Sequence, residues 1–344
     1  MKIRYAAAMA SVAVAALAAA AGMGPSAKAS PTAAGATGGA VPITAGGRAH
    51  MFPRPQVLAD VHNGDSRGGS PPLQYHSGPI MKTAVNYIVL WNPGHLQNGT
   101  ATGYSSKYTS LLSRWFKDVG GGGLYANNTQ YSQGGGVFVQ NSAKFGGVFT
   151  DTTPFPTGQC SNPDTGTNCI TDANLAAEAA AVAKAHSISA GLTKDFFVFT
   201  PAGEGSCFDA GCSYPSYTYY CAYHSYTNAT FGNSPYLLYA NMPYPTDPVG
   251  NNCYASYLGQ TFPNGDVNAD AAINVTSHEQ METVTDPLLS AWYDAAGYEI
   301  GDECAWNFGS NNWPSGGNQE RNGHPYDLQL EASNHSADCV TSGP

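Results

Sequence analysis

Eight cysteines, all between Cys160 and Cys339, are the feature that most constrains the fold of this 344-residue chain. An even number of cysteines in a chain that carries an export signal predicts disulfide bonds. No CxxC pair is present, so a cysteine-rich zinc knuckle is disfavoured. Four bridges are expected. Spacing does not fix their connectivity, and we predict only Cys160–Cys169 and Cys304–Cys339.

The N-terminus predicts export. Residues 1–29 start with Lys2 and Arg4, continue in an Ala-rich apolar run, and end in Ala27-Lys28-Ala29. A basic start, an apolar middle and a small-x-small end form a secretory signal peptide. The run is short for a membrane span, which favours cleavage over an anchor. We therefore expect a secreted, extracellular protein with no membrane insertion once the signal is removed.

The charge of the chain excludes one class of partner. The net charge is −10, and loss of residues 1–29 leaves 11 basic and 24 acidic residues, a net charge of −13. Such a surface repels phosphate backbones, so nucleic-acid binding is not expected.

Composition divides the remaining chain into two parts. Residues 30–74 are rich in Ala, Gly, Pro and Thr without a sustained apolar period, which predicts a flexible linker or a pro-segment. Residues 75–344 are long enough to bury one large core, so we expect a single catalytic domain there.

Strand-like and helix-like segments alternate within residues 75–344. This order predicts an α+β or α/β layer fold. The apolar runs predict buried strands, and the 3.6-residue periods and caps predict helices. Strands are expected at 84–91, 137–140, 147–150, 195–200 and 236–242, and helices at 104–119, 172–186 and 268–284. Residues 207–226 are expected to form a loop, and residues 292–339 short strands and loops.

The helix predicted at 268–284 carries the most informative motif. His278 and Glu282 are four residues apart, so they lie on one helical face and can reach one cation. Zinc takes such ligands at ~2.0–2.2 Å. Glu279 follows the first ligand, at the place where HExxH enzymes keep the general base that takes a proton from water. The pattern here is HExxE.

The rest of this helix supports a buried site. Its other residues are small or apolar, and a buried helix that carries His and Glu side chains needs a partner for their charges. A metal ion is one such partner. The alternative is a solvated helical face with an ordinary His–Glu pair.

A catalytic zinc usually has three protein ligands, so a third is expected downstream. Residues 298–304 alternate like a strand, with Asp302 on the same side as Ile300 and Cys304. This favours Asp302, with Glu299 second; either carboxylate could instead cap a turn. The downstream candidates are Asp286, Asp294, Glu299, Asp302 and Glu303.

These residues resemble a known family. The blocks His278-Glu279-x-x-Glu282, Thr285-Asp286-Pro287, Ala291-Trp292-Tyr293-Asp294 and Glu299-Ile300-Gly301-Asp302 are similar to the EXORDIUM/phosphate-induced protein family and its bacterial relatives. Residues 75–80 and 221–224 resemble that family's opening segment and Cys-loop. The resemblance implies an extracellular, cell-wall-associated protein. It also implies a zincin-like mixed sheet with a backing helix at 172–186 and an active-site helix at 268–284.

The leading hypothesis is a secreted zinc-dependent peptidase. His278, Glu282 and Asp302, or Glu299 in its place, would hold Zn²⁺, and Glu279 would be the general base. Protein or peptide substrates would lie along the strand at 236–242. His324, Tyr326 and His335 are transition-state candidates that we interpret as ordinary loop residues.

Two other hypotheses remain open. One is a non-catalytic EXORDIUM-like protein that binds a cell-wall polysaccharide or surface partner through loop Tyr and Trp residues. The other is a calcium-stabilised structural protein, although no EF-hand-like loop is present. Zinc content separates the first from the peptidase.

Overall fold

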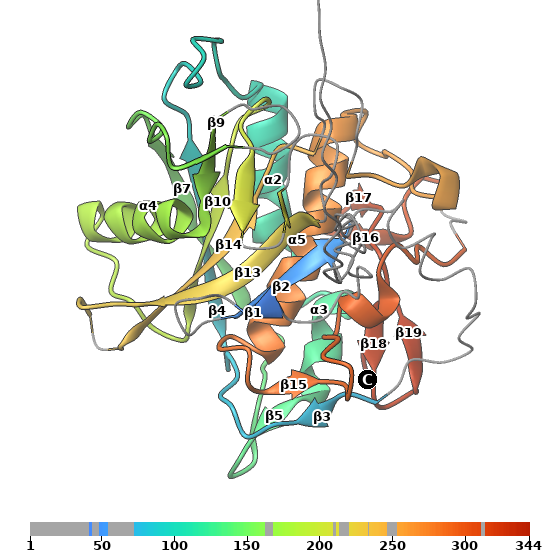
Figure 1. Ribbon diagram of the computed structural model, residues 1–344. Helices are drawn as coiled ribbons and strands as arrows, with labels where there is room; N and C mark the ends of the chain where they lie inside the picture. The colour runs from blue at the N-terminus through green and yellow to red at the C-terminus, as the bar shows by residue number, and fades with distance from the viewer. Residues whose placement is uncertain are drawn as a thin grey trace, which may run out of the picture. The chain divides into compact units, whose positions relative to one another are not determined.

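A seven-stranded mixed sheet forms the centre of the domain (Figure 1). The computed structural model describes residues 41–42, 48–53, 72–161, 168–208, 211–212, 220–232, 234–245, 253–310 and 314–344. In spatial order the strands are β1 (Val41–Pro42), β2 (Arg48–Pro53), β13 (Tyr220–Asn228), β14 (Tyr236–Met242), β10 (Lys194–Phe199), β4 (Ala84–Trp91) and β7 (Ala143–Asp151). Strands β14, β10, β4 and β7 are parallel, whereas β13 is antiparallel to both β14 and β2.

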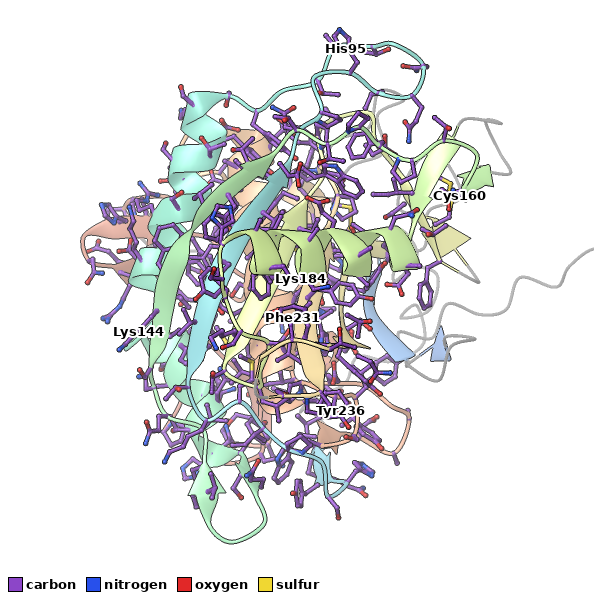
Figure 2. All side chains as sticks on the ribbon, turned by 90° about the vertical axis from the view of Figure 1, so that its left-hand side faces the viewer. His95, Lys144, Cys160, Lys184, Phe231 and Tyr236 are labelled. Carbon is purple, nitrogen blue, oxygen red and sulfur yellow. A yellow bond between two sulfur atoms is a disulfide. The ribbon has the colours of Figure 1, made fainter. Side chains whose placement is uncertain are left out.

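Helices cover both faces of this sheet. Helices α2 (Ser106–Asp118) and α5 (Val267–Thr285) pack on one face, and α4 (Asp172–Ala185) packs on the other. Strand β10 shows the division, because Phe197 joins the core under α2 and α5 while Phe196 joins the core under α4. Figure 2 shows α4 lying across the sheet, with Lys184 on the helix and Phe231 beside it.

Local sequence explains where the helices begin. Thr171 caps α4 by accepting a hydrogen bond from the backbone N–H of Asn174, whose side chain accepts from the Thr171 N–H in return. Ser105 caps α2 by accepting from the N–H of Tyr108 at 3.0 Å. Helix α2 ends before residues 120–123, four glycines that disfavour further helix.

Short elements complete the domain around the sheet. They are strands and helical turns of two to four residues. They are β3 (Gln74–Tyr75), α3 (Gly123–Ala126), η1 (Asn127–Gln130), β5 (Ser132–Gln133), β6 (Val137–Phe138), β8 (Cys160–Ser161), β9 (Asn168–Thr171), β11 (Ser206–Phe208), β12 (Gly211–Cys212), η2 (Ser256–Leu258), β15 (Trp292–Tyr293), η3 (Asp302–Cys304), β16 (Gln319–Arg321), β17 (His324–Tyr326), β18 (Glu331–Ser333) and β19 (Asp338–Val340).

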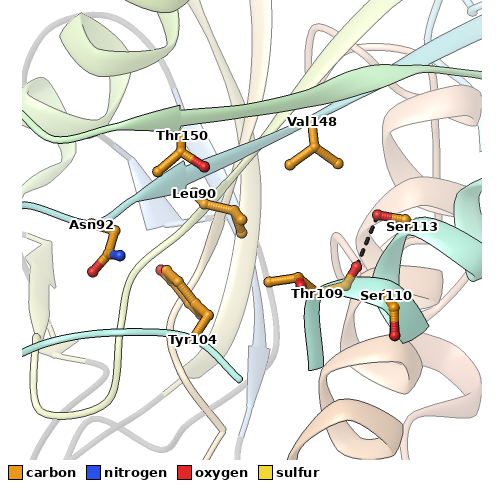
Figure 3. Close-up of a pocket in the computed structure, with 8 residues that line it drawn as sticks. All are labelled: Leu90, Asn92, Tyr104, Thr109, Ser110, Ser113, Val148 and Thr150. Atoms are coloured by element: carbon orange, nitrogen blue, oxygen red, sulfur yellow. Dashed lines mark hydrogen bonds between the residues drawn. The ribbon is translucent and has the colours of Figure 1, made fainter. Parts of the chain in front are cut away.

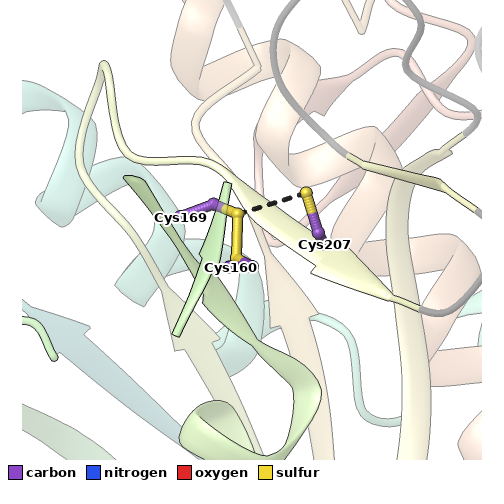
Figure 4. Close-up of side chains that lie close together, drawn as sticks. All are labelled: Cys160, Cys169 and Cys207. Carbon is purple, nitrogen blue, oxygen red and sulfur yellow. Dashed lines mark hydrogen bonds between the residues drawn. A yellow bond between two sulfur atoms is a disulfide. The ribbon is translucent and has the colours of Figure 1, made fainter. Parts of the chain in front are cut away.

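Disulfides join several of these short elements. Both predicted bridges are confirmed, and the described bridges are Cys160–Cys169, Cys221–Cys253 and Cys304–Cys339. The Cys207 sulfur lies 3.3 Å from that of Cys169 (Figure 4). Cys207 also faces Cys212 across the β11–β12 ladder. Because two of the three neighbouring sulfurs are already bridged, this cluster is a disulfide region and not a thiolate metal site.

The structure confirms the α+β class with a mixed sheet and corrects two local predictions. Strands β4 and β14 have the predicted bounds, and each predicted helix is present within two residues at either end. The loop predicted at 207–226 is wrong, because β13 begins at Tyr220 and belongs to the central sheet. Residues 48–53, predicted to lie in a linker or pro-segment, form β2 of the same sheet.

Two further findings concern the termini and membranes. The predicted signal peptide, residues 1–29, lies outside the described residues. Among the helices that the structure describes, none combines the length and apolar character needed to cross a membrane.

Candidate metal site beside helix α5

Helix α5 holds the predicted motif in the interior of the domain. Its side chains are buried throughout from Ala269 to Thr285. Asp266 caps its start by accepting from the N–H of Ala269 at 3.0 Å, and Asp286 ends it because Pro287 follows. The motif side chains therefore lie where unpaired charge is costly.

The structure brings together the three predicted zinc ligands. Nε2 of His278 lies 3.0 Å from Oε1 of Glu282 and 3.7 Å from Oδ1 of Asp302. The same Glu282 oxygen accepts a hydrogen bond from the backbone N–H of Asp302 at 3.1 Å. One imidazole nitrogen and two carboxylate oxygens thus converge on one small volume.

A second histidine lies on the other side of Glu282. Nε2 of His224, on β13, is 2.7 Å from Oε2 of Glu299 and 3.8 Å from Oε2 of Glu282. Glu282 is therefore placed between two imidazoles, one facing each of its oxygens. Glu299, the second choice for the third ligand, joins His224 and not His278.

Residues 298–304 do not form the predicted strand. The N–H of Cys304 donates to the carbonyl of Gly301 at 3.1 Å, and residues 302–304 form the 3₁₀ turn η3. The N–H of Glu299 donates to Oδ2 of Asp302 at 3.1 Å. Because the segment turns, Glu299 and Asp302 both lie beside α5, whereas a strand would have pointed them to opposite faces.

The other downstream acidic candidates have different surroundings. One oxygen of Asp286 accepts from the N–H groups of Ser290 and Ala291, and one oxygen of Asp294 accepts from those of Ala296 and Tyr298. These contacts stabilise turns, and the Asp286 side chain also lies beside Glu299. Glu303 is only partly buried.

Glu279 is the most isolated carboxylate of the site. It is completely buried, and neither oxygen accepts a well-formed hydrogen bond from the described residues. Desolvation raises its pKa well above the ordinary value, and the negative charges of Glu282, Asp302 and Asp195 raise it further. The backbone N–H of His224 is the one neighbour that lowers this pKa, and it does not offset the burial.

Sequence reasoning missed two buried side chains that complete the surroundings. Gln329 donates from Nε2 to Nδ1 of His278 at 2.9 Å and to the carbonyl of Gly301, which orients the ring so that Nε2 faces Glu282. Glu331 on β18 is buried, and desolvation followed by the charges of Glu282 and Asp302 raises its pKa. A polar residue at every second position of the apolar stretch Leu328-Gln329-Leu330-Glu331-Ala332 is the signal that could have found both.

Gly301 is required by close packing against the histidine. A Cβ at this position would lie 2.5 Å from Nδ1 of His278 and 2.8 Å from Cε1. Only glycine therefore lets the turn approach the imidazole closely enough for Asp302 to reach it.

The donor set fits a divalent metal ion. Two histidines and the carboxylates of Glu279, Glu282 and Glu299 fall into two groups whose ligand atoms lie within 4.8 Å of one another. All are buried, and without a cation their negative charges repel one another in a region of low dielectric. Nitrogen and oxygen donors at this spacing are those that zinc uses in catalytic sites.

An aromatic stack closes the site on the His278 side. The ring of Phe52, on β2, lies 3.9 Å from that of His278 and 4.4 Å from that of Trp306, with interplanar angles of 12° and 18°. Phe52 and His278 are fully buried. The segment that composition predicted to be a linker or pro-segment thus covers the predicted ligand.

The predicted transition-state candidates lie elsewhere. Nδ1 of His324 and the hydroxyl of Tyr326 contact Oδ2 of Asp118 at 2.6 and 2.7 Å, at the end of α2. His335 is exposed, and its backbone N–H donates to Gln130. These contacts agree with the interpretation of all three as structural residues.

A hollow on another part of the sheet has no comparable chemistry. It encloses about 380 Å³ between α2 and the ends of β4 and β7 (Figure 3). Its lining has no ionisable side chain apart from the phenol of Tyr104, whose hydroxyl donates to the carbonyl of Phe199. The α5 site is therefore the stronger candidate.

Comparison with known proteins gives two partial similarities. No family model matches the chain, and no solved structure matches it. The chain is 41% identical to Protein EXORDIUM-like 3 of Arabidopsis thaliana over 66 residues, 18% of this chain and 20% of that protein. It is 42% identical to Protein EXORDIUM-like 5 of the same plant over 52 residues, 14% of each chain.

The chain is similar to EXORDIUM-like proteins. It matches a fifth or less of the length of these relatives. The similarity agrees with the family expected from residues 278–304, and the peptidase core expected from the HExxE motif stays a prediction.

Proposed function

We propose that this chain is an extracellular, EXORDIUM-like protein that binds one zinc ion and hydrolyses peptide bonds at the α5 site. The observation that carries the proposal is the burial of His278 beside two carboxylates, with its Nε2 3.0 Å from Oε1 of Glu282 and 3.7 Å from Oδ1 of Asp302. The disulfides support an oxidising, extracytoplasmic environment. The similarity to EXORDIUM-like proteins supports the same location.

His278, Glu282 and Asp302 would hold the zinc ion. When bound, zinc supplies Lewis acidity toward a carbonyl and makes water more acidic. In the present hydrogen-bond arrangement the Gln329 amide donates to Nδ1 of His278, so Nε2 carries the ring proton and faces Glu282. Ligation through Nε2 would move this proton to Nδ1, with the Gln329 amide turned so that its carbonyl oxygen accepts from Nδ1.

Glu279 is placed to move a proton. Its carboxyl is buried next to Glu282 on the same helix, and burial raises its pKa in the metal-free protein. A bound cation would favour the carboxylate form, which could accept a proton from water and return it to a leaving amine. His224, held at 2.7 Å by Glu299, is a second proton-holding pair on the opposite side of Glu282. It is suited to stabilise negative charge on a substrate carbonyl.

A second candidate function rests on an aromatic surface. Tyr75 and His76 are exposed, Tyr75 lies 5.4 Å from Trp292, and His76 stacks on Tyr293 at 3.6 Å between centroids. Strands β3 and β15 pair Tyr75 with Trp292, and His76 directly follows β3. Such rings stack on sugar faces, so this surface favours a non-catalytic binder of a cell-wall polysaccharide.

Metal analysis followed by peptide hydrolysis tests the first proposal. We expect about one zinc per chain in the purified protein, loss of zinc in His278→Ala, and retention in the exposed control His335→Ala. Glu279→Gln should keep its zinc and lose roughly 100-fold or more in kcat/KM. Absence of zinc rejects the metal site.

The same experiment separates the two candidates. Zinc binding with equal hydrolysis by wild type and Glu279→Gln removes Glu279 from the chemistry. Retention on insoluble cell-wall polysaccharide that Tyr75→Ala abolishes, without hydrolysis, supports the binder. No retention removes that second candidate.

A further inference from the structure

We propose that the edge of β13 and the slot between His278 and Trp306 form a groove for an extended peptide with an aromatic side chain. Strand β2 is the chain's own occupant of this groove. The inference rests on the proposed peptidase function for its catalytic meaning, and it names the class of substrate that the site accepts.

The backbone pairing of β2 is that of a bound peptide. Strand β2 lies antiparallel to β13, with Phe52 opposite Ala222 and residue 50 opposite His224. Addition of an extended segment to a sheet edge supplies main-chain hydrogen bonds that do not depend on sequence. His224 belongs to the candidate metal-site cluster, so a peptide paired with this edge lies beside that cluster.

The edge of β13 takes the role of substrate-binding edge that the sequence assigned to the strand at 236–242. Strand β14, predicted to present its edge to substrate, is paired on both sides by β13 and β10. A peptide cannot add to an interior strand. Strand β13 is paired with β14 on one side, and its other side is the one that β2 occupies.

The Phe52 side chain fills a slot of matching shape. Its ring is nearly parallel to both His278 and Trp306, at centroid distances of 3.9 and 4.4 Å. Two rings at these distances would overlap if they shared one face of Phe52, so Phe52 lies between them. A flat aromatic side chain fits this slot, and a branched or charged one does not.

Strand β2 has weaker attachments than the other long strands of the sheet. Among the residues that the structure describes, its far side pairs with β1, a two-residue strand, whereas β14, β10 and β4 each have a long strand on both sides. Its sequence belongs to the Gly-, Ala- and Pro-rich stretch that separates it from the rest of the domain. A strand with one long ladder, one two-residue ladder and a stacked Phe52 ring is suited to exchange with another peptide.

Cleavage and exchange in the full chain test this proposal. A specific protease site is inserted within residues 54–71 of the full chain, the protein is cut, and a fluorescent hexapeptide of residues 48–53 is added. Anisotropy should show binding to cut protein and none to uncut protein. The peptide with Phe52→Ala should bind roughly 30-fold more weakly, since about 2 kcal/mol of apolar burial is lost.

A variant pair in the uncut chain gives a second measurement. Phe52→Ala should let the labelled peptide enter without cleavage, whereas Phe52→Tyr, which keeps the ring, should exclude it. Phe138→Ala removes an exposed phenylalanine on β6 and should behave like wild type.

Binding is measured with chelator present, so it is independent of hydrolysis. Equal affinity of wild-type and Phe52→Ala peptides, failure of β2 to exchange after cutting, or unfolding of the cut protein each overturns the groove. Peptide binding without any zinc-dependent hydrolysis keeps the groove and rejects only the peptidase.

Discussion

Helices α4 and α5 pack on opposite faces of one sheet and differ in how they treat buried charge. Helix α4 buries Leu175, Val182 and small residues, and exposes its other side to solvent. It buries one carboxyl, Glu178, whose pKa is raised to about 8 by desolvation and then by the neighbouring Asp151. Helix α5 is buried all round and places His278 and Glu279 in contact with further acidic residues.

The contrast between α4 and α5 indicates which buried charges favour a bound metal ion. A single carboxyl such as Glu178 becomes neutral by keeping a proton and sharing a hydrogen bond with Asp151. The α5 cluster combines several carboxyls with two imidazoles whose nitrogens face them, so a divalent cation can replace several protons at once. Burial of a carboxyl does not by itself indicate a metal site. A metal site is indicated where imidazole and carboxylate donors lie close together.

The largest expected effect is the loss of zinc-dependent stabilisation when the α5 cluster is disrupted. Glu282→Ala should remove zinc binding, because Glu282 lies between both imidazoles. At zinc concentrations 100-fold above the wild-type Kd, wild type should gain about 2.7 kcal/mol of unfolding free energy and the variant none. Thermal unfolding with and without zinc measures this.

The matched control is Glu178→Ala on α4, which should show the full zinc-dependent gain. A zinc-dependent gain in Glu282→Ala equal to that of wild type would contradict the assigned ligand.

A second substitution tests the close approach of the η3 turn to α5. Gly301→Ala should destabilise the protein by about 1–3 kcal/mol and weaken zinc binding, because the added methyl group meets the His278 ring. Gly103→Ala, where nothing lies within 4 Å of the added atom, should change stability by less than about 0.5 kcal/mol. Urea unfolding of both variants checks the difference.

A third prediction uses the pH dependence of the lone carboxyl on α4. Because the pKa of Glu178 is higher in the folded state, that state binds more protons, and stability falls as pH rises from about 4.5 to about 8. Glu178→Gln removes this loss. The variant should equal wild type at pH 4 and exceed it by about 2 kcal/mol at pH 8, measured by urea unfolding.

The exposed residue Glu320 provides the control, since Glu320→Gln should change stability by less than about 0.5 kcal/mol. A profile for Glu178→Gln that runs parallel to wild type from pH 4 to 8 would refute the assignment.

The smallest effect concerns the caps that start the two helices. Thr171→Ala at α4 and Asp266→Ala at α5 should each cost about 1 kcal/mol, because each removes one acceptor for an N-terminal N–H group. Unequal losses, with α5 much less affected, would show that tertiary packing alone fixes α5. Thermal unfolding at one fixed pH compares them.

Local patterns predicted those parts of the fold that local forces determine. The strand at 84–91 is a continuous apolar run, and Thr171 and Pro287 mark helix ends through their own backbone chemistry. Strand β13 was missed because its Tyr, His and Ser residues resemble a loop, although Tyr220, Tyr223, His224 and Ser225 are buried by neighbours distant in sequence. Strand β2 was missed for the same reason: its pairing with β13 is wholly non-local.

The candidate site follows the same rule. His278, Glu279 and Glu282 could be predicted because helical spacing fixes their relation. Asp302 was chosen for the wrong reason, since a turn, and not an alternating strand, brings it to His278. His224 and Glu331 reach the cluster through tertiary structure; the alternating pattern of residues 328–332 marks Glu331 as buried but does not say which residues it meets.

The Cys304–Cys339 bridge makes assembly of this centre depend on oxidation. It ties the η3 turn, which carries Asp302, to the β18–β19 hairpin, which carries Glu331. In a reduced chain this covalent link is absent, so the η3 turn and the β18–β19 hairpin are not covalently joined. Under the proposed zinc function, formation of this bridge would precede stable capture of the ion.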